Sequence, residues 1–267
     1  MPNATLFSLT ALAAMIPAAV ASMRARSAPG PLFWLLLAVA IAGPLAWAWA
    51  QFSGGWRAGF APALWATVVA SLAVFAVVAA TTREGWRLAS LLLPYLVLLA
   101  LGALIWQDRT ARGLSAAAPE AWVGVHIAVS LLTYATLTVC AIAGLAAFLQ
   151  DRALKARRSG EGPARLLPPL SDAEALELRL LGVSTAILAL GVVTGMAVSY
   201  LETGRALVFD HKTLFVLATL AVLVALLAAR RISGLRGRRA ARLVLLAYLL
   251  LTLAYPGVKF VTDVILA

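Results

Sequence analysis

The sequence predicts an all-α integral membrane protein, a polytopic bundle of about eight transmembrane helices. Of its 267 residues, 63% are hydrophobic, which is more apolar surface than a soluble single domain carries. The apolar runs are long and continuous, without the period-two alternation of membrane β-barrel strands. The basic residues gather between these runs, a pattern typical of proteins that obey the positive-inside rule.

Eight segments are long and apolar enough to cross a bilayer, which takes about 20 residues. The first lacks a basic segment before it, and Arg24 and Arg26 follow it instead, so we expect an uncleaved span rather than a signal peptide. The fifth, WVGVHIAVSLLTYATLTVCAIAGLAAFL, carries no formal charge. The expected spans are residues 4–22, 31–50, 61–81, 88–106, 122–149, 178–200, 213–229 and 243–266.

The distribution of Lys and Arg predicts the orientation of the chain. Sixteen of the 22 basic residues fall in the connections after spans one, three, five and seven, counting Arg179 at the very start of span six. The positive-inside rule places these connections in the cytoplasm and both termini in the periplasm, as expected of a multi-pass protein of the bacterial inner membrane. Six tryptophans near the outer ends of spans suit an interfacial belt there: Trp47, Trp49, Trp56, Trp65, Trp106 and Trp122.

The longest connection divides the chain into two parts. Residues 1–117 hold helices 1–4, and residues 118–267 hold helices 5–8 with a cytoplasmic linker near 150–177. We expect a short surface helix in the acidic segment SDAEALELRL, with Ser171 as its N-cap.

The net charge of +11 would suggest nucleic acid as a partner of a soluble protein. Here the charge follows membrane topology, so the expected contact is with membrane lipid, and no nucleic-acid partner is expected. The single cysteine, Cys140, lies in the middle of a span, where it is expected to be a packing residue.

The two histidines of the chain fall at the same predicted membrane face. His126 lies four residues inside the start of span five, and the helical period places Ser130, Thr133 and Tyr134 on its face. Polar side chains find no hydrogen-bond partner in hydrocarbon, so this face is expected to look inward, at protein or at a ligand. His211 directly precedes span seven.

Two imidazoles at similar depth can hold one metal-centred ligand between them. Neutral imidazole is a good ligand for haem iron, so the expected cofactor is haem b, with His126 and His211 as the metal ligands and Tyr134 beside it. Arg109, Arg112 and Arg205 lie in the outer connections and can pair with its propionates.

Each of these residues also has a structural interpretation. An interfacial histidine is often only hydrogen-bonded, and loop arginines often contact lipid headgroups. Lys259 and Asp263, one turn apart in span eight, can pair with each other. Zinc is a weaker alternative to haem, because two histidines without a cysteine or a suitably placed carboxylate pair fall short of a closed tetrahedral site.

Span five resembles the histidine-bearing helix of the CcsA/CcmC/HemX-type cytochrome c assembly family, through Trp122, His126, Ser130, Tyr134, Ala135 and Gly144. The helix ending in Gly191 to Gly195, the segment DHKTLFVLATLAVLVAL and the last span, with AYPGVKFVTDVIL, are similar to the elements that follow in the family. The likeness covers about residues 118–267, and the eight-span plan resembles the YpjD-like (HemX-like) branch.

The resemblance implies a haem-binding membrane protein of cytochrome c maturation, with His126 as a haem ligand and other maturation components as partners. The tryptophan-rich WWD signature is missing, since residues 201–212 contain no tryptophan. His211 has no counterpart in the family pattern, and topology alone suggests it as the second ligand.

We therefore expect a protein that holds or passes haem near the periplasmic face and is not an enzyme, since no carboxylate pair or nucleophile–base arrangement appears. The alternative is a membrane scaffold or regulator of haem biosynthesis that acts through the basic connections 150–179 and 230–242. A transporter gains little support, because no inverted repeat is visible.

Overall fold

The structure is a computed structural model that describes residues 2–24, 29–53, 57–107, 112–113, 119–157 and 162–262. Within these ranges eight helical segments are long and apolar enough to cross a membrane, which confirms the predicted fold class. The helices are α1 (Pro2–Ser22), α2 (Pro31–Phe52), α3 (Phe60–Thr81), α4 (Ala89–Ile105), α5 (Glu120–Lys155), α6 (Leu170–Thr203), α7 (His211–Ile232), α8 (Arg238–Thr252) and the short α9 (Val258–Phe260).

Short elements connect or extend these helices. Single turns of 3₁₀-helix precede α4 and α6, and a π-helical stretch joins α8 to α9 around Pro256, whose ring nitrogen has no hydrogen to donate. Two strands of two residues pair antiparallel between the connections that follow α2 and α4. These elements are η1 (Gly85–Leu88), η2 (Gly162–Leu166), η3 (Leu253–Gly257), β1 (Arg57–Ala58) and β2 (Arg112–Gly113).

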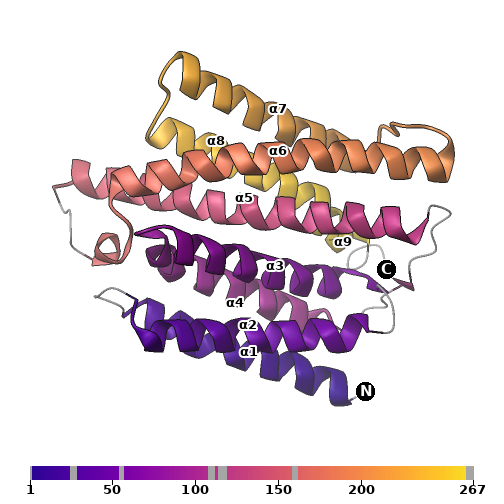
Figure 1. Ribbon diagram of the computed structural model, residues 1–267, viewed down its shortest axis with the longest axis horizontal. Helices are drawn as coiled ribbons and strands as arrows, with labels where there is room; N and C mark the ends of the chain where they lie inside the picture. The colour runs from indigo at the N-terminus through magenta and orange to yellow at the C-terminus, as the bar shows by residue number, and fades with distance from the viewer. Residues whose placement is uncertain are drawn as a thin grey trace.

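The helices lie side by side and alternate in direction, so that successive connections fall at opposite ends of the bundle (Figure 1). α1 and α2 form one side and α7 and α8 the other, while α5 lies between them and packs against α3, α6 and α8. The connections after α1, α3, α5 and α7 share the left-hand end in Figure 1, which we call the basic end. The chain ends lie at the other, which we call the opposite end. Which end faces the cytoplasm stays a prediction.

Small residues on α5 let α6 approach closely. A Cβ added at Gly144 would lie 3.6 Å from the side-chain carboxyl carbon of Glu177. Cys140 is buried at the same contact, with its Sγ 3.5 Å from the Glu177 carbonyl oxygen. Small side chains at helix interfaces are the usual means by which transmembrane helices pack. Cys140 is therefore a packing residue, as predicted.

The acidic segment in the connection after α5 is helical and leads into span six, as expected. The bounds differ from the prediction, because α5 continues to Lys155 and the segment forms the first turns of α6 itself. Ser171 is not the N-cap, because α6 begins at Leu170 after Pro169 and no side chain caps it. The helix continues without a break because the apolar face of this segment, with Ala173, Leu176 and Leu180, packs into the bundle.

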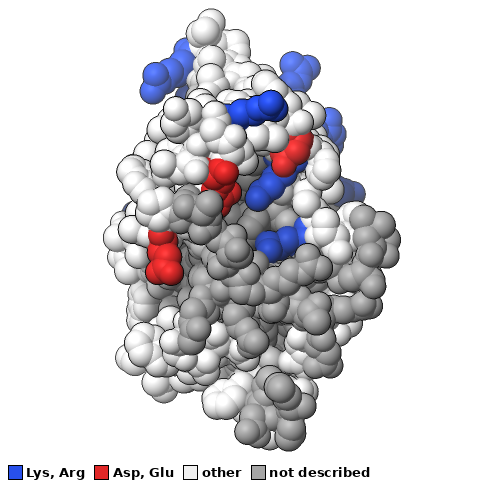
Figure 2. Space-filling view, turned by 90° about the vertical axis from the view of Figure 1, so that its right-hand side faces the viewer, with Lys and Arg blue, Asp and Glu red and all other residues white. Residues whose placement is uncertain are grey.

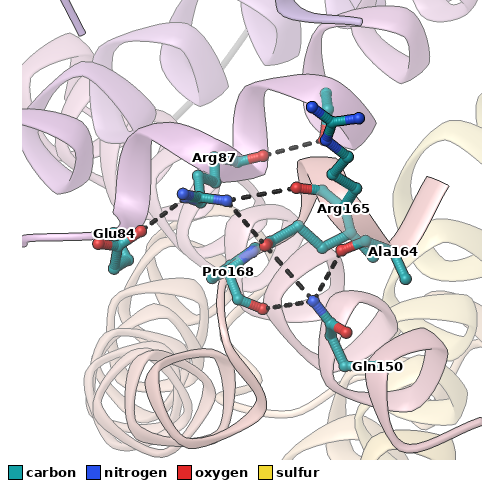
Figure 3. Close-up of polar contacts among 8 residues, drawn as sticks. Glu84, Arg87, Gln150, Ala164, Arg165 and Pro168 are labelled. Atoms are coloured by element: carbon teal, nitrogen blue, oxygen red, sulfur yellow. Dashed lines mark hydrogen bonds and ion pairs between the residues drawn. The ribbon is translucent and has the colours of Figure 1, made fainter. Parts of the chain in front are cut away.

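Polar contacts attach this connection to the bundle at its basic end (Figure 3). The Gln150 amide donates to the carbonyl oxygens of Ala164 and Pro168 at 2.9 and 3.0 Å. The Arg87 guanidinium donates to the Arg165 carbonyl at 3.4 Å and forms an ion pair with Glu84 at 2.7 Å. These side chains satisfy loop carbonyl groups that would otherwise lack partners.

The prediction of an interfacial tryptophan belt is wrong for Trp47 and Trp65. Both indole rings are buried and stack on each other with centroids 5.1 Å apart. The Trp47 ring nitrogen donates to Ser8 Oγ at 2.9 Å, which explains how the indole N–H is satisfied inside the bundle. Trp49 and Trp122 are exposed, and Trp56 lies outside the described residues.

Candidate functional site

The polar stripe of α5 faces the interior of the bundle. His126, Ser130, Thr133 and Tyr134 together line a cavity of about 90 Å³, closed on its other sides by residues of α6, α7, α8 and η3. The helical period predicted that these four side chains share one face. The structure confirms that this face looks inward.

A larger pocket of about 360 Å³ adjoins this inner cavity. Its walls come from α6, from the start of α7 and from the connection between them, and His126 reaches it from α5. His126, Gly191, Lys212 and Val216 line both spaces. The imidazole therefore lies where the pocket and the inner cavity meet.

The hydrogen bonds around the His126 ring indicate its tautomer. Its Nδ1 lies 3.1 Å from Thr194 Oγ1, and the Thr194 hydroxyl itself donates to the Gly191 carbonyl at 3.1 Å. With the Thr194 hydroxyl donating to Gly191, the hydrogen-bond network assigns the tautomer in which Nδ1 carries the hydrogen and Thr194 accepts it. The lone pair then lies on Nε2, for which no hydrogen-bond partner is found among the described residues. A neutral imidazole oriented in this way is typical of a metal ligand.

Gly195 lets the imidazole lie against α6. A Cβ added at this position would be 3.0 Å from His126 Cε1 and 3.7 Å from Nε2. At Gly191, one turn earlier, an added Cβ would be 3.6 Å from Val129 Cγ1, an ordinary van der Waals distance. The histidine position thus depends on a glycine at 195 more than at 191.

The connection from α6 to α7 is shaped by residues suited to helix ends. α6 ends at Gly204 with φ of 71°, a left-handed conformation that glycine adopts readily. The Asp210 carboxylate caps α7 by accepting from the Thr213 backbone N–H at 2.7 Å. This hydrogen bond lowers the pKa of Asp210 below its usual value.

Charged side chains surround the pocket entrance. Glu202, Asp210 and Lys212 all line the pocket, so two carboxylates and one ammonium group frame it. Figure 2 looks onto the opposite end of the bundle, where acidic and basic side chains lie close to one another. The apolar part of the lining includes Val192, Met196 and Leu217. Such a pocket suits a ligand with an apolar body and a polar edge.

The remaining predicted site residues take different places. His211 is exposed as the first residue of α7 and is not among the described residues that line the pocket, although Asp210 and Lys212 on either side of it are. Arg205 is exposed, and its carbonyl accepts from Ser199 Oγ at 2.9 Å. It does not line the pocket within the described part of the chain. Arg109 and the Arg112 side chain lie outside the described residues, as does Asp263.

Tyr134 belongs to a hydrogen-bonded cluster beneath the inner cavity. Its hydroxyl lies 3.0 Å from Thr252 Oγ1 and 3.3 Å from the Tyr248 hydroxyl. The Tyr248 hydroxyl in turn pairs with that of Tyr95 on α4, so the cluster joins α4, α5 and α8. Tyr134 is buried and borders the cavity wall without lining the larger pocket.

Sequence reasoning missed Met196 and Lys212 as pocket residues and Thr194 as the hydrogen-bond partner of His126. Gly195 appeared only as part of a family-like motif, not as a contact of His126. Position 194 is separated from His126 by 68 residues, and nothing in the local pattern of α6 marks it. No group of three or more His, Cys, Asp or Glu residues suited to a metal is found among the described residues.

Comparison with known proteins shows the family to which the chain belongs. The description "Cytochrome C assembly protein" applies to the family that matches residues 29–266. The "Uncharacterized 28.8 kDa protein in nifR3-like 5'region" of Azospirillum brasilense is 49% identical over 271 residues, which cover all of both chains. The "Cytochrome c biogenesis protein CcsA" of Synechococcus sp. (strain CC9902) is 28% identical over 177 residues, covering 59% of this chain and 58% of that protein. The chain thus belongs to the cytochrome c assembly protein family.

Proposed function

We propose that this protein binds haem b in the pocket between α5, α6 and α7, where His126 would hold the iron. Membership of the family supports a role in cytochrome c biogenesis, in which haem is a reactant. The positive-inside distribution supports a location in the bacterial inner membrane, with the pocket toward the periplasm. The protein would hold or pass haem and perform no covalent chemistry itself.

The observation that carries the proposal is the hydrogen bonding of His126. Nδ1 donates to Thr194, which leaves the Nε2 lone pair available at the wall of a pocket. An interfacial histidine with a purely structural role would be expected to use its ring nitrogens within the protein. A metal-binding histidine uses one nitrogen for orientation and offers the other.

The volume and the lining of the pocket also bear on whether it can hold haem. The pocket volume of about 360 Å³ lies within the usual range of roughly 300–1,000 Å³ for ligand sites. Its apolar walls suit a porphyrin face. Lys212 is the one ammonium group of the described lining that can meet a propionate, and it lies beside the carboxylates of Glu202 and Asp210, of which Asp210 is engaged in capping α7. When bound, haem would supply the iron and its redox chemistry. The chain would orient it through His126 and limit the access of water.

Two residues are candidates for a second ligand to the iron. Topology favours His211, which is exposed one residue before Lys212. The pocket lining favours Met196, whose thioether is an established haem ligand in combination with histidine. The two ligand pairs give different spectra and different reduction potentials, so they can be told apart.

The test is an absorption spectrum of the full chain purified in mild detergent. We expect a Soret band and a sharp reduced α band that His126→Ala abolishes. Thr194→Val should weaken haem binding by about 10- to 100-fold, the usual effect of removing a hydrogen-bond partner of a metal ligand, while Thr194→Ser should retain binding. A folded protein that stays colourless after haem is added would overturn the proposal.

A second candidate function is that of a scaffold or regulator acting from the basic end. It is favoured by the contacts of Gln150 and Arg87, which hold the η2 connection in a defined position against the bundle (Figure 3). Its partners would be other components of cytochrome c maturation. Co-purification that is lost in Gln150→Ala but kept in His126→Ala would support this function over haem binding.

A further inference from the structure

A second cavity lies at the basic end, on the far side of the bundle from His126. It has a volume of about 540 Å³, larger than the pocket beside His126, and is bounded by α1, α2, η1 and α4. The volume lies in the range of small-molecule sites, roughly 300–1,000 Å³. None of its lining residues belongs to the proposed haem pocket.

The walls of this cavity are apolar and continue onto the outer surface of the bundle. Leu37, Trp86 and Leu93 are buried side chains that form its inner wall. Val20 and Leu32 also line it, yet they are exposed, by 43% and 66%. In a bilayer these exposed side chains face lipid, so the cavity is open sideways to an acyl chain.

Positive charge lies at the rim of this cavity. Arg24 lines it with an exposed side chain, and no ion pair of Arg24 occurs among the described residues. Arg87 lies behind the inner wall, 5.1 Å from the Trp86 ring centroid, but its charge is matched by Glu84 at 2.7 Å. No described acidic residue lines the cavity, and the Ser22 hydroxyl already donates to the Ala19 carbonyl at 2.7 Å. Arg24 is therefore available to an anion.

We propose that this cavity binds an anionic phospholipid, with an acyl chain against Leu37 and Leu93 and the phosphate against Arg24. A soluble anion would gain nothing from the apolar walls, and an uncharged lipid would gain nothing from Arg24. Basic pockets between transmembrane helices on the cytoplasmic side are typical sites for anionic headgroups. The bound lipid would fasten α1 and α2 to α4, and its binding is independent of haem.

The test uses the full chain reconstituted in mixtures of phosphatidylglycerol and phosphatidylcholine, with retained lipid measured by native mass spectrometry after detergent extraction. The wild type should retain one phosphatidylglycerol in preference to phosphatidylcholine. Arg24→Gln should lower that preference about fivefold, the effect expected of one basic residue near an anionic headgroup. Ala21→Trp, which fills the cavity, should lower retention of both lipids.

Arg83→Gln is the matched control, because Arg83 is an exposed arginine at the same end that does not line the cavity. It should leave the preference unchanged, and Arg24→Lys should largely retain it. Helical content measured by circular dichroism shows whether each variant is folded. Equal retention of the two lipids by the wild type, or an equal loss in Arg83→Gln and Arg24→Gln, would overturn the proposal.

Discussion

The Arg230 guanidinium lies 2.8 Å from the Glu177 carboxylate, and both side chains are almost inaccessible, at 5% and 1% exposure. The pair joins the basic-end part of α7 to α6, where Gly144 of α5 gives the carboxylate room. α7 is otherwise lightly packed: Thr219, Leu223 and Leu226 are its buried residues. Each buried charge is stabilised by the other, because hydrocarbon offers no alternative partner. This contact therefore attaches the basic-end part of α7 to α6.

Removing one member of this pair should destabilise the protein strongly. Arg230→Met leaves the Glu177 carboxylate buried without a counter-charge, so we expect the free energy of unfolding to fall by about 3–5 kcal/mol. Arg231→Met, at the exposed neighbouring position, should change it by less than about 0.5 kcal/mol. The measurement is denaturant unfolding in detergent. Equal effects of the two substitutions would show that the buried contact contributes little.

The double variant Glu177→Leu/Arg230→Met shows how much of the loss in unfolding free energy comes from the unpaired charge and how much from loss of the ion pair itself. Replacement of a buried ion pair by apolar side chains is often neutral, so we expect the double variant to recover most of the stability lost in Arg230→Met. If it is as unstable as the single variant, packing rather than charge accounts for the loss.

Haem retention should depend on glycine at one position of α6 and not at the next turn. Gly195→Ala places a Cβ 3.0 Å from His126 Cε1 and should displace the ring, lowering haem affinity by about tenfold or more. Gly191→Ala brings only an ordinary contact of 3.6 Å with Val129 and should have little effect. Titration with haem, followed at the Soret band, measures both. A greater loss in Gly191→Ala than in Gly195→Ala would contradict the proposed position of His126.

The identity of the second axial ligand can be settled by two substitutions. Because Met196 lines the pocket and His211 does not, we expect Met196→Leu to shift the reduced α band and to lower the reduction potential. His211→Ala should leave both unchanged. The reverse outcome would assign the second ligand to His211, as the topology predicted from the sequence.

The cap of α7 should make the pocket connection sensitive to acid. The Thr213 N–H holds the pKa of Asp210 below its usual value, so the stabilisation is present above the pKa of the unfolded chain. It is lost as the pH falls through the lower pKa of the folded state. Asp210→Ala should remove about 1 kcal/mol of helix stability, whereas Asp210→Asn should keep the cap without the acid sensitivity. Hydrogen exchange of residues 204–216, corrected for the intrinsic effect of pH, measures the difference.

Much of the candidate site was predictable because α5 carries it in one local pattern. The shared face of His126, Ser130, Thr133 and Tyr134 follows from helix geometry, and the structure confirms that it looks inward. The arginines expected to meet propionates were harder to place, because a loop residue has no helical period to orient it. Arg205 does not line the pocket within the described part of the chain, whereas Lys212, at the start of α7, does.

The sequence by itself determined the all-helical membrane fold, the eight spans and the inward face of α5, because length, hydropathy and the helical repeat act within one segment. Only the tertiary structure decided that Thr194 orients His126, that Arg230 neutralises Glu177 and that Trp47 and Trp65 stack inside the bundle. Each of these contacts joins different helices. Their partners depend on how the helices cross and rotate against one another, which no single segment encodes.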